Sequence, residues 1–137
     1  MESAVAAPRI RWLRALLAGF LGELALMVVL VAIYAVAADP RPAAELTIPL
    51  ASFPLLALAG YWAARSVPGH GMLQGAIAGA FATLLYLAMS GTVVAADPKV
   101  DFASMLIPAY LLSHALKISG GAFGGWLVAR KGVRPAA

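Results

Sequence analysis

Four long apolar runs, separated by short polar breaks that contain proline or glycine, constrain this chain more than any other feature. The runs extend from about Leu16 to Ala38, Leu46 to Ala64, Met72 to Ala96 and Phe102 to Ala129. About 20 apolar residues are enough for a helix to cross the hydrocarbon core of a bilayer. The sequence therefore predicts an all-α integral membrane protein, an up-down bundle of four helices.

The composition agrees with a membrane class and leaves little room for anything else. Hydrophobic residues make up 63% of the 137 residues and charged residues 12%, against roughly 25% charged residues in a typical soluble domain. We therefore expect one transmembrane domain over residues 1–137, with the lipid bilayer as its main partner. The net charge of +4 comes from basic residues beside the runs, so we expect no nucleic-acid partner. The absence of cysteine excludes disulfides, thiol catalysis and cysteine metal sites.

The first apolar run also resembles a signal peptide, because basic residues precede it and Ala35-Val36-Ala37 resembles a cleavage site. The apolar core of a signal peptide is only about 7–15 residues long, and this run is longer. We therefore expect an uncleaved first span, preceded by a disordered segment from Met1 to Pro8.

Prolines mark the expected breaks and bends. Asp39-Pro40-Arg41-Pro42 should end the first helix, and Pro68-Gly69-His70-Gly71 should form a tight turn. Pro49 should occupy the first turn of the second helix, Pro54 should bend it, and Pro108 should bend the fourth.

The basic residues predict the orientation. With four crossings, seven of them fall on one side of the membrane and only Arg41 and Lys99 on the other. The side rich in lysine and arginine is normally cytoplasmic. We therefore expect a multi-pass protein of the cell membrane (the inner or plasma membrane) with both termini in the cytoplasm. The seven residues are Arg9, Arg11, Arg14, Arg65, Arg130, Lys131 and Arg134.

The chain also shows signs of an internal repeat. Val36-Ala37-Ala38-Asp39-Pro40-Arg41 recurs as Val94-Ala95-Ala96-Asp97-Pro98-Lys99, and Ile48-Pro49 recurs as Ile107-Pro108. These matches predict two tandem helical hairpins, at about residues 10–66 and 70–131, with chance similarity between alanine-rich segments as the alternative.

Glycines spaced along the runs predict close packing of the helices. Small residues four apart form a ridge that lets a neighbouring helix approach closely. A lipid or substrate contact is the alternative for these positions. The expected packing residues are Gly19, Gly22, Gly71, Gly75, Gly79, Gly120, Gly121, Gly124 and Gly125.

Three ionisable residues lie inside the apolar runs. Glu23 lies near the middle of the first run, and Lys117 near the middle of the fourth, with His114 three residues before it on the same face. A charge at the bilayer midplane is costly and needs a partner. Because we expect the first and last helices to be antiparallel neighbours, we predict a contact between Glu23 and Lys117.

This polar cluster admits two functional interpretations, with a charge facing a second subunit or a lipid headgroup defect as the remaining alternative. In the first, Glu23 and Lys117 form a structural ion pair that fixes helix register in a non-enzymatic scaffold or accessory subunit, within a homo-oligomer or a larger membrane complex. In the second, Glu23, His114 and Lys117 form the site of a small proton- or ion-coupled transporter. No nucleophile motif or metal-ligand spacing is present, so we expect no catalytic residue, metal or cofactor.

In its layout, four spans with one glutamate in the first, the chain resembles the small multidrug resistance transporters. The resemblance implies that the first-span glutamate binds drug and protons, a role that only Glu23 could carry. Lys117, the proline-rich outer loops and the strong basic bias depart from the family pattern. We therefore do not assign the chain to that family.

Overall fold

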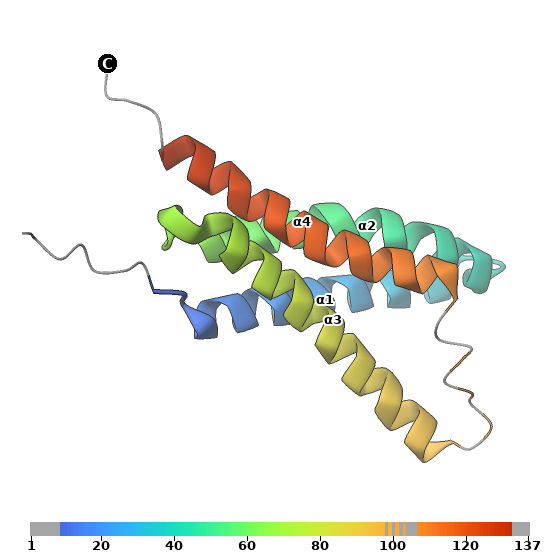
Figure 1. Ribbon diagram of the computed structural model, residues 1–137. Helices are drawn as coiled ribbons and strands as arrows, with labels where there is room; N and C mark the ends of the chain where they lie inside the picture. The colour runs from blue at the N-terminus through green and yellow to red at the C-terminus, as the bar shows by residue number, and fades with distance from the viewer. Residues whose placement is uncertain (1–8, 98, 100, 102, 104–106, 133–137) are drawn as a thin grey trace, which may run out of the picture.

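The computed structural model describes residues 9–97, 99, 101, 103 and 107–132, and these form a bundle of four helices (Figure 1). Helix α1 spans Trp12–Val36, α2 Pro40–Ala64, α3 Gly71–Ala96 and α4 Pro108–Gly132. The short 3-10 helix η1, Pro68–His70, occupies the tight turn expected before α3. The segment before Arg9 and the last five residues lie outside the described residues.

Two helix starts differ from the sequence prediction, and proline explains both. Helix α2 begins at Pro40, so Pro49 lies inside the helix rather than in its first turn. Helix α4 begins at Pro108, so the expected bend within a longer fourth helix is wrong. Proline lacks an N–H group that the first turn would not use, and its φ angle suits a helix start. Because Pro49 and Pro108 occupy different positions in their helices, the structure adds no support for the internal repeat.

The packing order corrects the expected neighbours. Helices α2 and α3 contact each other, and each also packs against both α1 and α4. Helices α1 and α4 are not among the closely packed pairs of described helices, so they lie on opposite sides of the α2–α3 pair. The expectation that the first and last helices are direct neighbours is therefore wrong.

Alanines make up most of the apolar core, and many large apolar side chains lie outside. Fully buried positions include Ala15, Ala63 and Ala78, whereas Val31 and Leu58 are among many large apolar residues that are exposed. A soluble protein rarely exposes such a contiguous apolar surface, but a bilayer covers it. Of the described helices, α1, α2 and α3 are long and apolar enough to cross a membrane. Helix α4 has 25 residues but carries Ser113, His114, Lys117 and Ser119, so its crossing stays a prediction.

The two ends of the bundle differ in how tightly they pack. At the basic end, defined by Arg11, Arg14, Arg65, Arg130 and Lys131, all four helices meet. Arg14 bonds to Trp62, Lys131 bonds to Tyr61, and Gly71 of α3 contacts Gly125 of α4. At the opposite end, where α1 ends and α2 begins, α3 diverges from the other helices (Figure 1). We call this the far end. Gly91 lies on the diverging part of α3, and a Cβ atom added there would have nothing within 4 Å.

Candidate functional site

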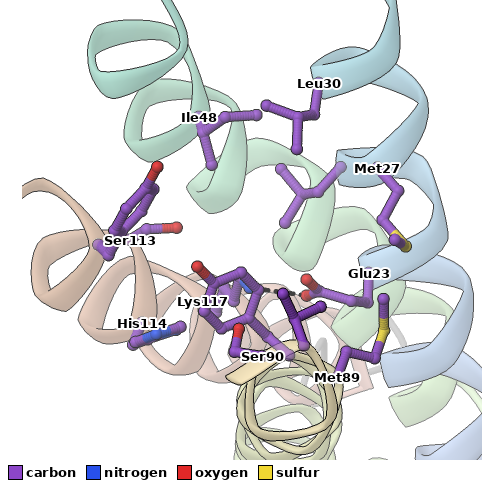
Figure 2. A pocket seen from close by; sticks show the side chains of 13 residues that line it. Glu23, Met27, Leu30, Ile48, Met89, Ser90, Ser113, His114 and Lys117 are labelled. Atoms are coloured by element: carbon purple, nitrogen blue, oxygen red, sulfur yellow. Dashed lines mark hydrogen bonds and ion pairs between the residues drawn. The ribbon is translucent and has the colours of Figure 1, made fainter. Parts of the chain in front are cut away.

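The predicted contact between Glu23 and Lys117 is present in the structure. Lys117 Nζ donates a hydrogen bond of 2.7 Å to Glu23 Oε2. Both residues are buried, with exposed fractions of 3% for Glu23 and 2% for Lys117. Figure 2 shows the two side chains pointing toward each other from α1 and α4. The pair therefore joins the two helices that lie on opposite sides of the bundle.

Close packing of α3 on α4 lets the lysine side chain reach across. A Cβ atom at Gly79 of α3 would overlap the carbonyl oxygen of Lys117, so the two backbones touch at this level. On the other side, Gly22 precedes Glu23 and packs against Leu56 of α2. The absence of side chains at Gly79 and Gly22 brings both backbones close to the centre of the bundle.

Tyr86 of α3 completes the surroundings of the ion pair. Its ring centroid lies 4.8 Å from Lys117 Nζ, within the range of a cation–π contact. The same ring lies 4.9 Å from the His114 ring, centroid to centroid. His114 is half-buried, and its Nδ1 atom is buried without a hydrogen-bond partner among the described residues. Tyr86 thus links the three ionisable residues into one cluster.

Two serines connect α2 to α4 beside this cluster. Ser52 Oγ donates to the Ile48 carbonyl oxygen at 2.8 Å and lies 2.6 Å from Ser113 Oγ. A hydroxyl group has one proton to donate, so Ser113 is the donor of the second bond. Both hydroxyls are satisfied, and each is buried. These serines therefore hold the part of α4 that carries His114 and Lys117.

A partly open cavity of about 190 Å³ lies on the far-end side of the ion pair. Its base is polar, with Glu23, Lys117, His114, Ser90 and Ser113. Its remaining lining is made of large apolar and aromatic side chains, several of them visible in Figure 2. These are Leu26, Met27, Leu30, Ile48, Tyr86, Met89, Val93 and Tyr110.

On the basic-end side of the pair, the bundle is closed by backbone contacts at glycines. A Cβ atom at Gly60 or Gly75 would overlap the carbonyl oxygen of Gly121, and Gly71 and Gly125 meet in the same way. Gly120 lies against Phe53 of α2, and Gly124 against Ala57. We refer to the glycines at these helix contacts as the glycine zone: Gly60, Gly71, Gly75, Gly79, Gly120, Gly121, Gly124 and Gly125.

The remaining glycines of the sequence prediction lie on α1. A Cβ atom at Gly19 would overlap the carbonyl oxygen of Ala78 on α3, whereas Gly22 faces a leucine side chain rather than backbone. Helix α1 is therefore packed closely on α3 on the basic-end side of the ion pair.

Gln74 is a buried polar residue outside the cavity that the sequence prediction missed. It is fully buried in α3, and its amide group makes two bonds to the backbone of Arg11: Oε1 accepts from the N–H at 3.1 Å, and Nε2 donates to the carbonyl at 2.8 Å. The start of α1 is thereby fixed to α3. A polar residue within an apolar run was the available signal, the same signal that identified Glu23.

No group of three or more histidine, aspartate or glutamate side chains among the described residues could hold a metal ion. Ser119 Oγ donates to the carbonyl oxygen of Ala115 at 2.9 Å, so this hydroxyl is satisfied within its own helix. The described arrangement can hold an ion pair in a low-dielectric environment. The cavity on the far-end side of this pair can bind a small molecule.

Comparison of the chain with protein family models, with curated proteins and with solved structures finds no match. The functional inference therefore depends on the geometry of the cavity and of the ion pair.

Proposed function

We propose that this chain is a small proton-linked transporter of the cell membrane, with four spans in up-down order and both termini in the cytoplasm. The exposed apolar surface supports membrane insertion. The clustering of Arg11, Arg14, Arg65, Arg130 and Lys131 at one end supports a cytoplasmic basic end. Tyr61, Trp62 and Trp126 lie among these basic residues, as expected for aromatic anchors at a membrane interface.

The proposed topology can be tested with reporter fusions. A reporter inserted between Pro40 and Pro42, at the start of α2, is expected on the outer side, because α1 alone separates this position from the cytoplasmic N-terminus. A reporter fused after Ala137 is expected on the cytoplasmic side. Alkaline phosphatase and green fluorescent protein provide complementary readouts. The same side for both positions would exclude four spans.

One observation carries the transport proposal: the ion pair lies between an open half and a closed half of the bundle. The cavity lies on the far-end side of Glu23 and Lys117, and the glycine zone closes the basic-end side. A transporter opens its binding site toward one half of the membrane at a time, around a site near the midplane. In this proposal, the described conformation is the state that is closed toward the cytoplasm.

The chemistry of the pair offers a link to protons. When Glu23 accepts a proton it loses its charge, and Lys117 is left without its ion-pair partner. A buried ammonium without a partner is strongly disfavoured. Protonation would therefore favour a rearrangement that gives Lys117 a new acceptor, either from cargo or from another helix. In this mechanism Glu23 is the proton-binding residue, Lys117 its competing partner and His114 a further polar group of the site.

A scaffold or accessory subunit is the second candidate function. The closed glycine zone and the short Glu23–Lys117 bond favour it, because a satisfied buried pair can serve only to fix helix register. The two candidates differ in one measurable property. A scaffold keeps one conformation, whereas a transporter populates at least two.

Distances between spin labels can distinguish the two functions. The natural chain has no cysteine, so the pair Val36→Cys and Val93→Cys reports the far end between α1 and α3. Leu13→Cys and Met72→Cys report the basic end, and all four positions are exposed. For a transporter in nanodiscs we expect two distance populations at each end, with opposite shifts when Glu23→Gln mimics the protonated residue. One unchanged population at both ends, in folded protein with and without Glu23→Gln, would support the scaffold and contradict transport.

A further inference from the structure

Exposed lining residues on α1 and α3 point to a mouth on the side of the bundle rather than at its end. Met27 of α1 and Val93 of α3 line the cavity and are also exposed, by 36% and 50%. Neighbouring positions on the outside of α1, such as Val28 and Val31, are exposed and apolar as well. In a membrane-spanning bundle these surfaces face acyl chains. The divergence of α3 seen in Figure 1 therefore opens the cavity toward lipid.

The polar base of the cavity has unused hydrogen-bonding capacity. The described contacts of Glu23 involve Oε2, which leaves Oε1 as an acceptor, and Ser90 Oγ has no hydrogen-bond partner among the described residues. Lys117 has three N–H donors and uses one of them for Glu23. A ligand at the base can thus accept a hydrogen bond from one group and donate a hydrogen bond to another.

The charge of the base restricts the ligand. While Glu23 is ionised, its charge and that of Lys117 cancel, so in this state the occupied site stays neutral only when its ligand is neutral. An added cation or anion would leave an unbalanced charge in a low-dielectric environment, which is unfavourable. Hydrogen bonds from a neutral hydroxyl, carbonyl or amide carry no such penalty and satisfy the free groups.

The volume and the lining of the cavity limit the size of the part of the ligand that can be buried in it. A cavity of about 150 Å³ lined by aliphatic and aromatic side chains is large enough for benzene, and this cavity measures about 190 Å³. It can therefore hold one ring-sized head group. A longer apolar tail would leave through the mouth between Met27 and Val93 into the hydrocarbon.

We propose that the cavity binds a neutral, lipid-dissolved amphiphile, whose hydrogen-bonding head lies against Glu23, Lys117 and Ser90 and which enters sideways from the bilayer between α1 and α3. This inference rests on the proposed function, because it names the class of cargo for the same cavity. It differs from an aqueous ion site in both the charge of the ligand and the route of entry.

A set of four matched probes tests the charge of the ligand: 4-hexylphenol, hexylbenzene, 4-hexylbenzoate and 4-hexylbenzylammonium. Binding to the full chain in nanodiscs is measured from ligand-induced increases in unfolding temperature, with each probe corrected for its partition into protein-free nanodiscs. We expect 4-hexylphenol to bind about tenfold more tightly than hexylbenzene, since hexylbenzene lacks the hydrogen-bonding group. Tighter binding of either charged probe, or no binding of 4-hexylphenol, would overturn the inference.

Two variants on α3 test the place of entry. Val93→Trp should fill the mouth, where the hexyl chain of 4-hexylphenol would lie. The loss of that contact should weaken 4-hexylphenol binding about tenfold. Leu84→Trp is the matched control, because Leu84 is exposed on the same helix but does not line the cavity. Equal binding by both variants, each folded, would contradict entry between α1 and α3.

Cysteine modification in sealed vesicles tests whether water offers another route. An impermeant methanethiosulfonate should modify Asp97→Cys, at the exposed end of α3, at least about 100-fold faster than Ser90→Cys at the cavity base, because the reagent reaches only thiols in contact with water. Similar rates would show an aqueous route and overturn the lipid route.

Preference for a charged probe would refute this inference while cavity binding survives. A single spin-label distance at each end would instead refute transport, whatever the probes show.

Discussion

Replacing Lys117 with methionine is expected to lower the free energy of unfolding by about 3–5 kcal/mol, the usual result of removing one partner from a buried ion pair. The substitution keeps most of the length of the side chain but leaves the Glu23 carboxylate buried without its 2.7 Å partner. Glu23→Met should have a similar effect, because it leaves the ammonium group unpaired. Unfolding in mixed detergent micelles, followed by circular dichroism, provides the measurement.

The double variant, Glu23→Met with Lys117→Met, should recover much of the loss, since two apolar side chains need no partner. The exposed pair of Arg41 and Glu45, at 3.4 Å on α2, provides the control. Glu45→Ala should change stability by no more than about 0.5 kcal/mol, as is usual for a surface pair one helical turn apart. If the effects of Glu23→Met and Lys117→Met simply add, the two residues do not interact in the folded protein.

Gly121→Leu is expected to prevent normal packing of the bundle. Gly121 of α4 lies where the backbones of Gly60 on α2 and Gly75 on α3 converge, and even a Cβ atom there would overlap the Gly75 carbonyl oxygen. Overpacking by a few methylene groups costs about 1–3 kcal/mol in an adaptable core. We expect a larger loss here, because the neighbours are backbone atoms that cannot change rotamer. The apparent melting temperature in detergent and the yield of monodisperse protein are the measurements.

Gly91→Leu is the matched control for this variant. Gly91 also lies in a helix, but nothing lies within 4 Å of the position its Cβ would take. Because leucine has the higher helix propensity, Gly91→Leu should be neutral or stabilising by up to about 1 kcal/mol. Equal stability losses at Gly91 and Gly121 would show that the glycine zone is not a contact between helices.

The sequence was most informative where burial in an apolar run makes a polar group costly. Glu23 and Lys117 could be paired from the sequence because each has few other partners at its depth. The helices themselves followed from run length, and three of the four predicted runs correspond to helices apolar enough to cross a membrane. The helices between the two residues were not predictable, because their order depends on packing. Helices α2 and α3 separate α4 from α1, so Lys117 does not reach Glu23 from an adjacent helix.

Other features depend on packing that hydropathy does not record. Pro40 is compatible both with the end of one helix and with the start of the next, and the structure makes it the first residue of α2. Ser52 and Tyr86 contribute to the site only because α2 and α3 approach α4 at the right height. The cavity lies where α3 diverges from the other helices, and nothing in the sequence around Gly91 predicts that divergence.

The bond between α1 and α4 has a consequence for biogenesis. Ribosomes synthesise Glu23 long before Lys117, and α4 is the helix whose polar residues make it least able to enter lipid alone. Under the proposed four-span topology, the last helix therefore finds its counter-charge already present inside the nascent bundle. The insertion of α4 then depends on the helices made before it. A truncated chain that ends before Pro108 would keep Glu23 without its partner. Helix α4 expressed separately would lack the acid that it needs to leave the translocon for the lipid.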